Sequence, residues 1–336
     1  MLPIPFEIPL PRHYRWELLL EVLSRFAATA LFRVHDGAYY RAFRTEDTLT
    51  LFRLAPNATQ TMLEIQMLAH RKATPIPSPF PPTLERVAEK GSTSLSSLEA
   101  GIESNFVSYP LTPFARVVGA YPDSSVFYAY AQTQSDLWEW IAPIVGMPNF
   151  HSENLYEALL FTVIEQHISW ASALKIQVRF VDLFGDHIEY EGVRYGVLPT
   201  PEHLSSLTRE DLLPLKLTMT RLDLLIHIAD LFASGDLADW ESVTPQAMYT
   251  RLLTVKGIGH WTAAVTVARA YGIAPFVHDN DVALQAAVNA YLLKQPKRAS
   301  RADTLATFAP YGEHAGTVAN LLMMRWVLER YSPISG

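Results

Sequence analysis

Residues 252–263 read LLTVKGIGHWTA, and they lie between two segments with helical character. The first segment, Thr244 to Val255, opens with Thr-Pro, an N-cap followed by proline at the first helical position. The second, Trp261 to Tyr271, is followed by Gly272, which can close a helix in a left-handed conformation. The turn at 256–260 contains two glycines, which permit positive φ. We therefore expect a helix, a tight hairpin turn and a second helix.

The turn offers a binding site for a phosphate group. The backbone amides near Gly257, Gly259 and Trp261 have no intrahelical acceptor and lie at the positive end of the second helix's dipole. Ile258, between the glycines, can fill the gap between the helices with its side chain and so anchor the turn. A helix terminus of this kind binds an anion without any charged side chain.

The net charge of the whole chain, -7, is unfavourable for a protein that binds nucleic acid, because cationic side chains supply most of the non-specific affinity for phosphates. The local balance differs from the total. The last 86 residues carry nine Lys and Arg against five Asp and Glu. This excess is compatible with a nucleic-acid partner and equally with ordinary variation of a protein surface.

The composition indicates a chain that folds throughout. At 336 residues two or three domains are expected, and 49% hydrophobic with 18% charged residues argues against extensive disorder. The absence of cysteine excludes disulfides, thiolate zinc sites and iron-sulfur clusters. Glu21 and Arg25 interrupt the apolar stretch at 18–32, and no basic segment precedes an apolar run at the start. We therefore expect no signal peptide, no membrane span and a cytoplasmic location, at the nucleoid if the source is bacterial.

Residues 1–120 have the pattern of an α+β domain. Three stretches alternate between apolar and polar residues or run apolar, as half-buried strands do, and turn-forming residues separate them. These stretches are Ala38–Arg44, Thr48–Leu54 and Thr61–Met67. An amphipathic segment at Trp16–Ala28 predicts a helix, and the prolines within 72–82 predict a loop. We expect an antiparallel sheet with a few helices.

Helix signals dominate from about residue 123. Ser152 precedes an i, i+3, i+4 stripe of apolar residues that starts at Leu155, so it is a candidate N-cap. Asp211–Ser234 continue the helical pattern. We expect residues 121–336 to be mainly α, in two subdomains with a cleft between them and a boundary near 200–245. The C-terminal helix can complete the first subdomain.

The turn and the residues that follow it resemble a known family. Residues 252–263 resemble the helix-hairpin-helix of the DNA glycosylase superfamily, and VHDND at 277–281 resembles its catalytic loop. Phe161–Ser169, with EQHIS at its end, resembles the family's early helix and minor-groove wedge. LPTPE at 198–202 resembles its interdomain connector. Trp16 and residues 36–44 resemble the N-terminal sheet domain of the AlkA type (3-methyladenine DNA glycosylase II). The resemblance therefore covers nearly the whole chain.

This resemblance implies a DNA glycosylase of base excision repair. Such an enzyme hydrolyses the N-glycosidic bond of an alkylated base in duplex DNA after the base has flipped out of the stack. It would work as a monomer, with its catalytic site in the cleft between the two helical subdomains. Two alternatives stay open: a glycosylase for oxidised or mismatched bases, and a non-catalytic scaffold that uses the hairpin only to bind DNA.

Asp281 is the candidate catalytic residue. Breaking an N-glycosidic bond builds positive charge on the deoxyribose, which a fixed carboxylate near C1′ stabilises. Asp281 precedes the apolar segment 282–288, so it would cap a helix whose amides and dipole keep it ionised. Asp279 competes for the role, and Asp281 taken alone is readily explained as a helix cap. The spacing from the hairpin in the family favours Asp281.

The position after the hairpin indicates whether the DNA backbone is also cut. Bifunctional relatives carry a lysine nucleophile one residue past the hairpin, where it forms a Schiff base. Trp261 occupies that position here, and Lys256 lies before the two glycines of the turn. We therefore expect a monofunctional enzyme without lyase activity.

The resemblance also implies the substrate pocket and the DNA contacts. Trp261, Val265 and Tyr311, the last within FAPY at 308–311, are the pocket candidates, and aromatic faces favour cationic alkylated purines. The wedge position falls on His167, where the AlkA type has an aliphatic residue. Gly312-Glu313-His314 replaces a more basic segment. The expected DNA contacts are Gln166, His167, Gly257, Ile258, Gly259, His260 and Thr262.

One monovalent cation is implied as well. In the family, hairpin carbonyls hold such an ion, and the matching backbone carbonyls here belong to Leu253, Val255 and Ile258. The eleven histidines show no zinc-protease spacing. We expect no catalytic metal and no required cofactor.

Overall fold

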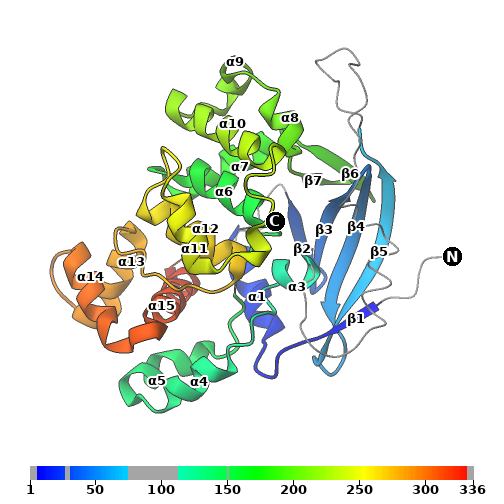
Figure 1. Ribbon diagram of the computed structural model, residues 1–336. Helices are drawn as coiled ribbons and strands as arrows, with labels where there is room; N and C mark the ends of the chain where they lie inside the picture. The colour runs from blue at the N-terminus through cyan, green and yellow to red at the C-terminus, as the bar shows by residue number, and fades with distance from the viewer. Residues whose placement is uncertain (1–5, 27–30, 75–112, 150, 331–336) are drawn as a thin grey trace.

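The computed structural model describes residues 6–26, 31–74, 113–149 and 151–330. A sheet forms one side of the molecule, and helices form the other (Figure 1). The proline-rich loop expected within 72–82 lies outside the described residues from residue 75 onward. Among the described residues, no helix combines the length and the apolar character needed to cross a membrane.

The sheet has five antiparallel strands in the order β1-β5-β4-β3-β2. Their bounds are Phe6–Pro9 for β1, Phe32–His35 for β2, Ala38–Thr45 for β3, Thr48–Pro56 for β4 and Met62–Lys72 for β5. The three predicted strands are confirmed as β3, β4 and β5. Asp36 and Gly37 have positive φ at the β2–β3 turn, and Glu46 has positive φ at the β3–β4 turn. These tight turns set the strand register, with His35 opposite Ala38 and Thr45 opposite Thr48.

Each face of the sheet is covered by a different element. Helices α1 (Trp16–Leu23) and α3 (Pro113–Val117) share one apolar core with one face. The hairpin of β6 (Asp186–Tyr190) and β7 (Val193–Val197) shares another core with the opposite face. The helix predicted for Trp16–Ala28 is confirmed as far as Leu23, and the 3-10 turn η1 (Ser24–Phe26) follows it.

The helices form two cores. The first core contains apolar side chains from α6 to α12, together with Leu31. Its elements are α6 (Leu155–Glu165), α7 (Trp170–Phe184), α8 (Pro201–Ser205), α9 (Arg209–Leu212), η3 (Leu213–Leu215), α10 (Met219–Ala233), η4 (Trp240–Ser242), α11 (Pro245–Leu252) and α12 (His260–Tyr271). Leu204 and Trp240 both belong to it, so this core includes residues within the range 200–245 where we expected a boundary.

The second core combines two parts of the chain that are distant in sequence. Residues 125–147 pack there against residues 277–328 and against Leu18 and Val22 of α1. Its elements are α4 (Ser125–Gln132), α5 (Ser135–Ile141), η2 (Ala142–Ile144), α13 (Val282–Val288), the π-helical turn η5 (Asn289–Leu293), α14 (Arg301–Phe308), η6 (Ala309–His314) and α15 (Ala315–Arg330). The division of the chain into domains at 120/121 stays a prediction.

Two local predictions are wrong. Asn154, not Ser152, caps α6: its side chain accepts the amide of Glu157 at 2.9 Å, because extended backbone at Asn154 places it directly before the first turn. The continuous helix expected from Asp211 is broken before α10, because Pro214 cannot continue the hydrogen-bond ladder and Lys216 is left-handed with φ 58°. The predicted cap of α11 is confirmed, since Thr244 accepts the amide of Ala247.

Candidate active site

The predicted helix-hairpin-helix is present, with residues 253–259 between α11 and α12. Ile258 is buried in the first core, so it anchors the turn as expected. Gly257 has φ 96°, and a Cβ there would lie 3.0 Å from a methyl group of Leu224. Gly259 differs from the prediction: its φ of -98° is ordinary, because it is the N-cap of α12. A Cβ at Gly259 would meet open space, so its backbone can be approached closely.

The start of α12 presents amides without acceptors. The hydrogen bonds found among the described residues include none donated by the amides of Gly257, Gly259 or Trp261. Gly257 and Gly259 are exposed. These amides lie at the positive end of the helix dipole and can therefore hold a phosphate.

Gln166 and Thr262 fix the hairpin from inside. The Gln166 amide nitrogen donates to the Gly257 carbonyl at 3.1 Å and to the Thr262 hydroxyl at 3.0 Å. The two residues are 9% and 3% exposed, respectively. Their buried side chains attach the hairpin to the end of α6, and the DNA contact expected of both residues stays a prediction.

His167, next in sequence, is turned outward. It is exposed and has φ 56° in the loop between α6 and α7. Arg221 braces this loop by donating to the carbonyl of Gln166 at 2.8 Å, and Ser169 caps α7 by accepting the amide of Ser172. Because Gln166 is bonded to the hairpin, His167 is held beside it and projects into solvent.

Three N–H groups hold the carboxylate of Asp281. One oxygen accepts the amides of Ala283 at 2.8 Å and Leu284 at 3.0 Å, which makes Asp281 the N-cap of α13. The other oxygen accepts the indole N–H of Trp261 at 2.8 Å. Each donor stabilises negative charge, and Asp281 stays partly exposed. The start of α12 and the start of α13 therefore meet at one oriented carboxylate.

Asp279 has a different environment. It is 2% exposed, and Nε of Arg301 lies 3.1 Å from its Oδ2. Gln285 of α13 donates to its backbone carbonyl at 2.9 Å. A buried, neutralised carboxylate cannot reach a substrate. The geometry therefore favours Asp281 as the reactive carboxylate and gives Asp279 a structural role.

His260 joins the hairpin to the loop that carries both aspartates. Its Nε2 lies 3.2 Å from the carbonyl of Val277 and 3.3 Å from Asp279 Oδ1. Both oxygens accept, so Nε2 carries a proton, and Nδ1 lies within hydrogen-bond distance of the Tyr249 hydroxyl at 2.6 Å. The sequence did not reveal this link, because no local spacing brings Tyr249, His260 and Asp279 together. Burial lowers the pKa of His278, so its neutral ring adds no positive charge beside Asp281.

Trp261 and Val265 lie one turn apart on α12, and both are partly exposed. Arg269, one turn further along the same side, forms an ion pair with Glu165 of α6 at 2.8 Å. The ring of Trp261 and the side chain of Val265 thus form one stripe between the hairpin and this ion pair. Trp261 has a second role that the sequence did not show, since its indole N–H orients Asp281.

Tyr311 lies in η6 and packs against the second core, where burial raises the pKa of its hydroxyl. The ring of His314 packs against that of Tyr130 of α4 in a tilted arrangement, with ring centres 4.2 Å apart. Within the described part of the chain, no interaction joins Tyr311 to Trp261 or Asp281. Its place in the pocket stays a prediction.

The hairpin carbonyls fit a monovalent cation. Among the described residues, the carbonyls of Leu253 and Ile258 accept no hydrogen bond, and that of Val255 accepts only the amide of Ile258 at 3.0 Å. Backbone carbonyl oxygens with unused lone pairs are suitable ligands for such an ion. No cluster of three or more His, Cys, Asp or Glu that could hold a metal occurs in the described ranges.

Comparison with known proteins supports the resemblance seen in the sequence. No family model matches the chain. Over 128 residues, which are 38% of this chain and 41% of the relative, it is 35% identical to the DNA-3-methyladenine glycosylase of Bacillus subtilis (strain 168). Over 109 residues, 32% of this chain and 38% of the relative, it is 32% identical to DNA-3-methyladenine glycosylase 2 of Escherichia coli (strain K12). The matched parts thus span about two fifths of these curated relatives.

A solved structure matches much more of the chain. The 3-methyladenine DNA glycosylase from Archaeoglobus fulgidus superposes with a TM-score of 0.73 at 18% identity, and the match covers 97% of this chain and 98% of that one. The predicted fold class, a mainly α region with a helix-hairpin-helix after an α+β domain with an antiparallel sheet, is confirmed. The resemblance to the helix-hairpin-helix DNA glycosylase superfamily is therefore confirmed: the chain has its fold, and its sequence is similar to that of 3-methyladenine DNA glycosylases.

Proposed function

We propose that this protein is a monofunctional DNA glycosylase of base excision repair that removes alkylated bases of the 3-methyladenine type from duplex DNA. One observation carries the proposal: the partly exposed carboxylate of Asp281, held by three N–H donors, lies at the start of α13 and is bonded to Trp261 at the start of α12. A non-catalytic scaffold would not need an oriented carboxylate beside its phosphate site.

The hairpin would grip the DNA backbone. The amides at Gly257, Gly259 and Trp261 would hold a phosphate without a cationic side chain, which suits a chain of net charge -7. A monovalent cation on the carbonyls of Leu253, Val255 and Ile258 would add positive charge next to that phosphate.

Base flipping would follow from the loop at the end of α6. His167, exposed and held beside the hairpin, would fill the space that the extruded base leaves in the stack. The flipped base would then lie against Trp261, Val265 and Tyr311. Aromatic faces attract a cationic alkylpurine by about 0.5 to 2 kcal/mol.

Bond cleavage would rely on charge stabilisation. As the glycosidic bond breaks, its electron pair leaves with the base and positive charge spreads over C1′ and the ring oxygen. The fixed charge of Asp281 would stabilise this transition state. Water would then bond to C1′ and release a proton to solvent, and the cationic alkylpurine, which keeps the electron pair of the broken bond, would leave as a neutral base. Trp261 stands where a lyase would need a lysine, so no Schiff base would form.

Partners and location are part of the proposal. The partner would be double-stranded DNA with a damaged base, bound by a monomer. We place the protein in the cytoplasm, at the nucleoid if its source is bacterial.

A base-release assay tests the proposal. Duplex DNA with one alkylpurine or hypoxanthine is incubated with the protein, and alkali then cuts the strand at any abasic site. Asp281→Asn should slow release by about 100-fold or more, because it removes the charge that faces the transition state. Asp123→Asn is the matched control, since Asp123 also accepts an amide at the start of a helix, that of Ser125. Full activity in Asp281→Asn would contradict the mechanism.

Two further readouts separate the alternatives. Mass spectrometry of bases released from randomly methylated DNA identifies the substrate. Release of an oxidised or mismatched base, and not of an alkylated one, would favour the first alternative. Borohydride should trap no covalent adduct with DNA. A protein that binds abasic DNA but releases no base would be a scaffold.

A further inference from the structure

The positive charge in the last 86 residues is not spread evenly. Five of the nine Lys and Arg side chains are already engaged within the protein: Arg251, Arg269, Arg301 and Arg325 in ion pairs and Arg330 over the ring of Trp326. The other four form no ion pair with any described residue. They are Lys256, Lys294, Lys297 and Arg298. Lys256 lies within the hairpin, and the other three belong to one exposed loop.

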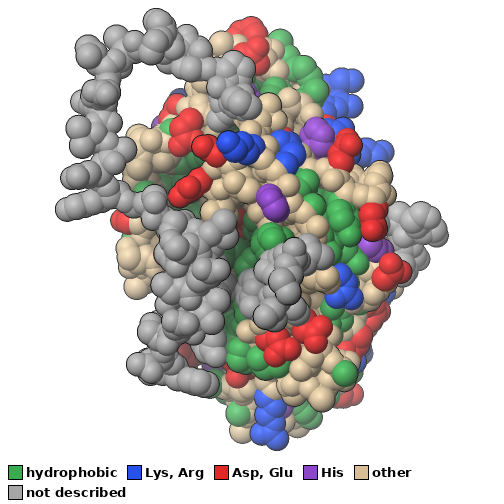
Figure 2. Space-filling model, turned by 90° about the vertical axis from the view of Figure 1, so that its right-hand side faces the viewer, with side chains coloured by type: hydrophobic (Ala, Val, Ile, Leu, Met, Phe, Trp, Pro, Cys, Tyr) green, Lys and Arg blue, Asp and Glu red, His purple; other side chains and the backbone are tan. Residues whose placement is uncertain are grey.

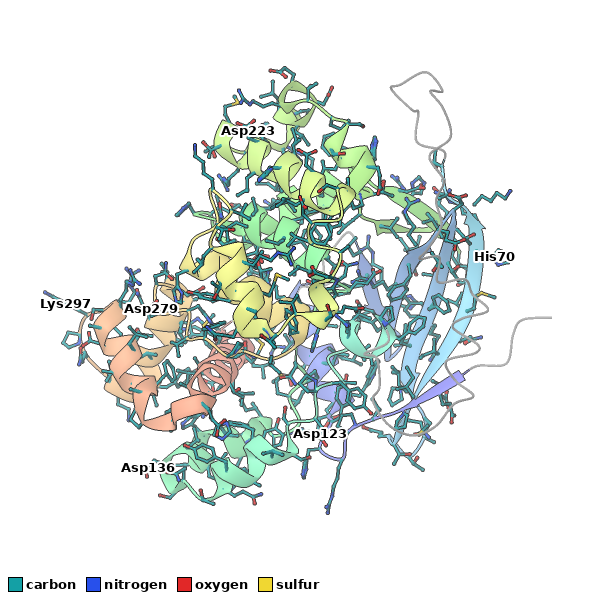
Figure 3. The ribbon with its side chains drawn as sticks, in the orientation of Figure 1. His70, Asp123, Asp136, Asp223, Asp279 and Lys297 are labelled. Atoms are coloured by element: carbon teal, nitrogen blue, oxygen red, sulfur yellow. The ribbon has the colours of Figure 1, made fainter. Side chains whose placement is uncertain are left out.

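This basic loop, residues 294–298, is held in place by its surroundings. The Asn289 side chain bonds to both backbone groups of Gln295, at 2.8 and 2.9 Å. Directly after the loop, Ala299 is buried and Ser300 caps α14. The loop backbone is therefore ordered before any ligand arrives, which lowers the entropy cost of binding. Figure 3 shows Lys297 at the outer edge of the lobe formed by α13 and α14, with Asp279 further in.

The basic loop lies at most about 18 Å along the chain from the candidate active site. The seven residues of α13 and the five of η5 separate it from Asp281, and they extend at most about 18 Å at 1.5 Å per residue. The chain then returns to the site, because Arg301 contacts Asp279. Lys297 is thus at most about 14 Å along the chain from Arg301. At 3.4 Å per step along a strand, 18 Å corresponds to about five nucleotides.

We propose that the basic loop is a second backbone contact, in which Lys294, Lys297 and Arg298 bind phosphates of the duplex a few nucleotides from the flipped base. This inference rests on the proposed function and extends its DNA-binding surface. The sheet side of the molecule lacks this concentration of charge: where Figure 2 draws side chains in colour, Lys and Arg are interspersed with Asp and Glu.

The test compares two variants that each lose two positive charges. Lys297→Gln/Arg298→Gln alters the basic loop, and the control Lys72→Gln/Arg194→Gln alters exposed residues of β5 and β7. Fluorescence anisotropy measures the affinity of each protein for a 25-base-pair duplex with a central abasic analogue between 50 and 200 mM KCl. Each lost phosphate contact lowers the salt slope by about 0.9, so the loop variant should show a slope smaller by about 1.8. When KCl rises from 50 to 200 mM, the factor by which the wild type loses affinity should therefore be roughly ten times the factor for the loop variant.

The control should keep the wild-type salt slope. On a duplex too short to reach the basic loop, the loop variant should bind with the wild-type affinity and salt slope. An unchanged slope in the loop variant, or an equal change in the control, overturns the inference. The base-release assay on the wild type is separate. If no base is released, the proposed function fails, while the slopes on duplex DNA still decide whether the basic loop contacts phosphates.

Discussion

At the residue scale, the indole N–H of Trp261 orients a carboxylate, a role that an aromatic ring without a donor cannot fill. It bonds to the second oxygen of Asp281, whose first oxygen is already occupied by helix amides. Trp261→Phe keeps an aromatic wall but removes this donor. A hydrogen bond to a charged group contributes about 1.5 to 3 kcal/mol, so single-turnover base release should slow by about tenfold or more. Affinity for abasic DNA should stay within twofold.

Trp138→Phe is the control, because its indole N–H bonds to no described residue and its ring lies in the second core. An unchanged rate in Trp261→Phe would show that the helix amides alone orient the carboxylate. The sequence predicted Asp281 as a cap, since capping depends on the next few residues. It could not predict the bond from Trp261, twenty residues earlier, because that bond depends on how α12 and α13 meet.

At the scale of the element, substitution of the two hairpin glycines should have different effects, mainly on stability at Gly257 and mainly on DNA binding at Gly259. Gly257→Ala forces a side chain into a backbone with φ 96°, so it should destabilise the protein by about 1 to 2 kcal/mol in urea unfolding. Gly259→Ala has ordinary φ and open space, so it should destabilise the protein less than Gly257→Ala does, by at most about 1 kcal/mol for the weaker N-cap of α12. Its methyl group would stand where a phosphate approaches, so affinity for duplex DNA should fall at least fivefold. Wild-type affinity in Gly259→Ala would mean that the phosphate lies elsewhere.

Sequence patterns located most elements and missed where some of them end. Strands β3 to β5 and the starts of α11 and α13 follow from alternation and capping, which are local. The helix expected from Asp211 failed because Pro214 and the left-handed Lys216 outweigh a favourable apolar pattern. The bond from Gln166 to the hairpin did not follow from the sequence, since a polar residue at a helix end can bind DNA or the protein itself.

At the scale of the whole molecule, a buried ion pair connects the sheet to the first helical core. Arg41 of β3 contacts Glu157 of α6 and lies 3.0 Å from Glu153. Neither this link nor the second core, which joins residues 125–147 to 277–328, follows from sequence periodicity, because both depend on contacts between distant segments. The ion pair therefore fixes the sheet to α6, which ends at Glu165, two residues before His167.

Arg41→Met should destabilise the whole fold by about 3 to 5 kcal/mol, because two carboxylates lose their buried counter-charge. Burial already raises the pKa of Glu153, and Arg41 opposes that rise, so the variant raises this pKa further. A carboxyl with a raised folded-state pKa contributes stability at low pH and loses it as pH rises. The deficit measured by urea unfolding should therefore be larger at pH 8 than at pH 5.

Asp223→Asn, which breaks the exposed pair with Arg209, should cost less than about 1 kcal/mol at both pH values. A pH-independent deficit in Arg41→Met would show that lost packing, not uncompensated charge, causes the destabilisation.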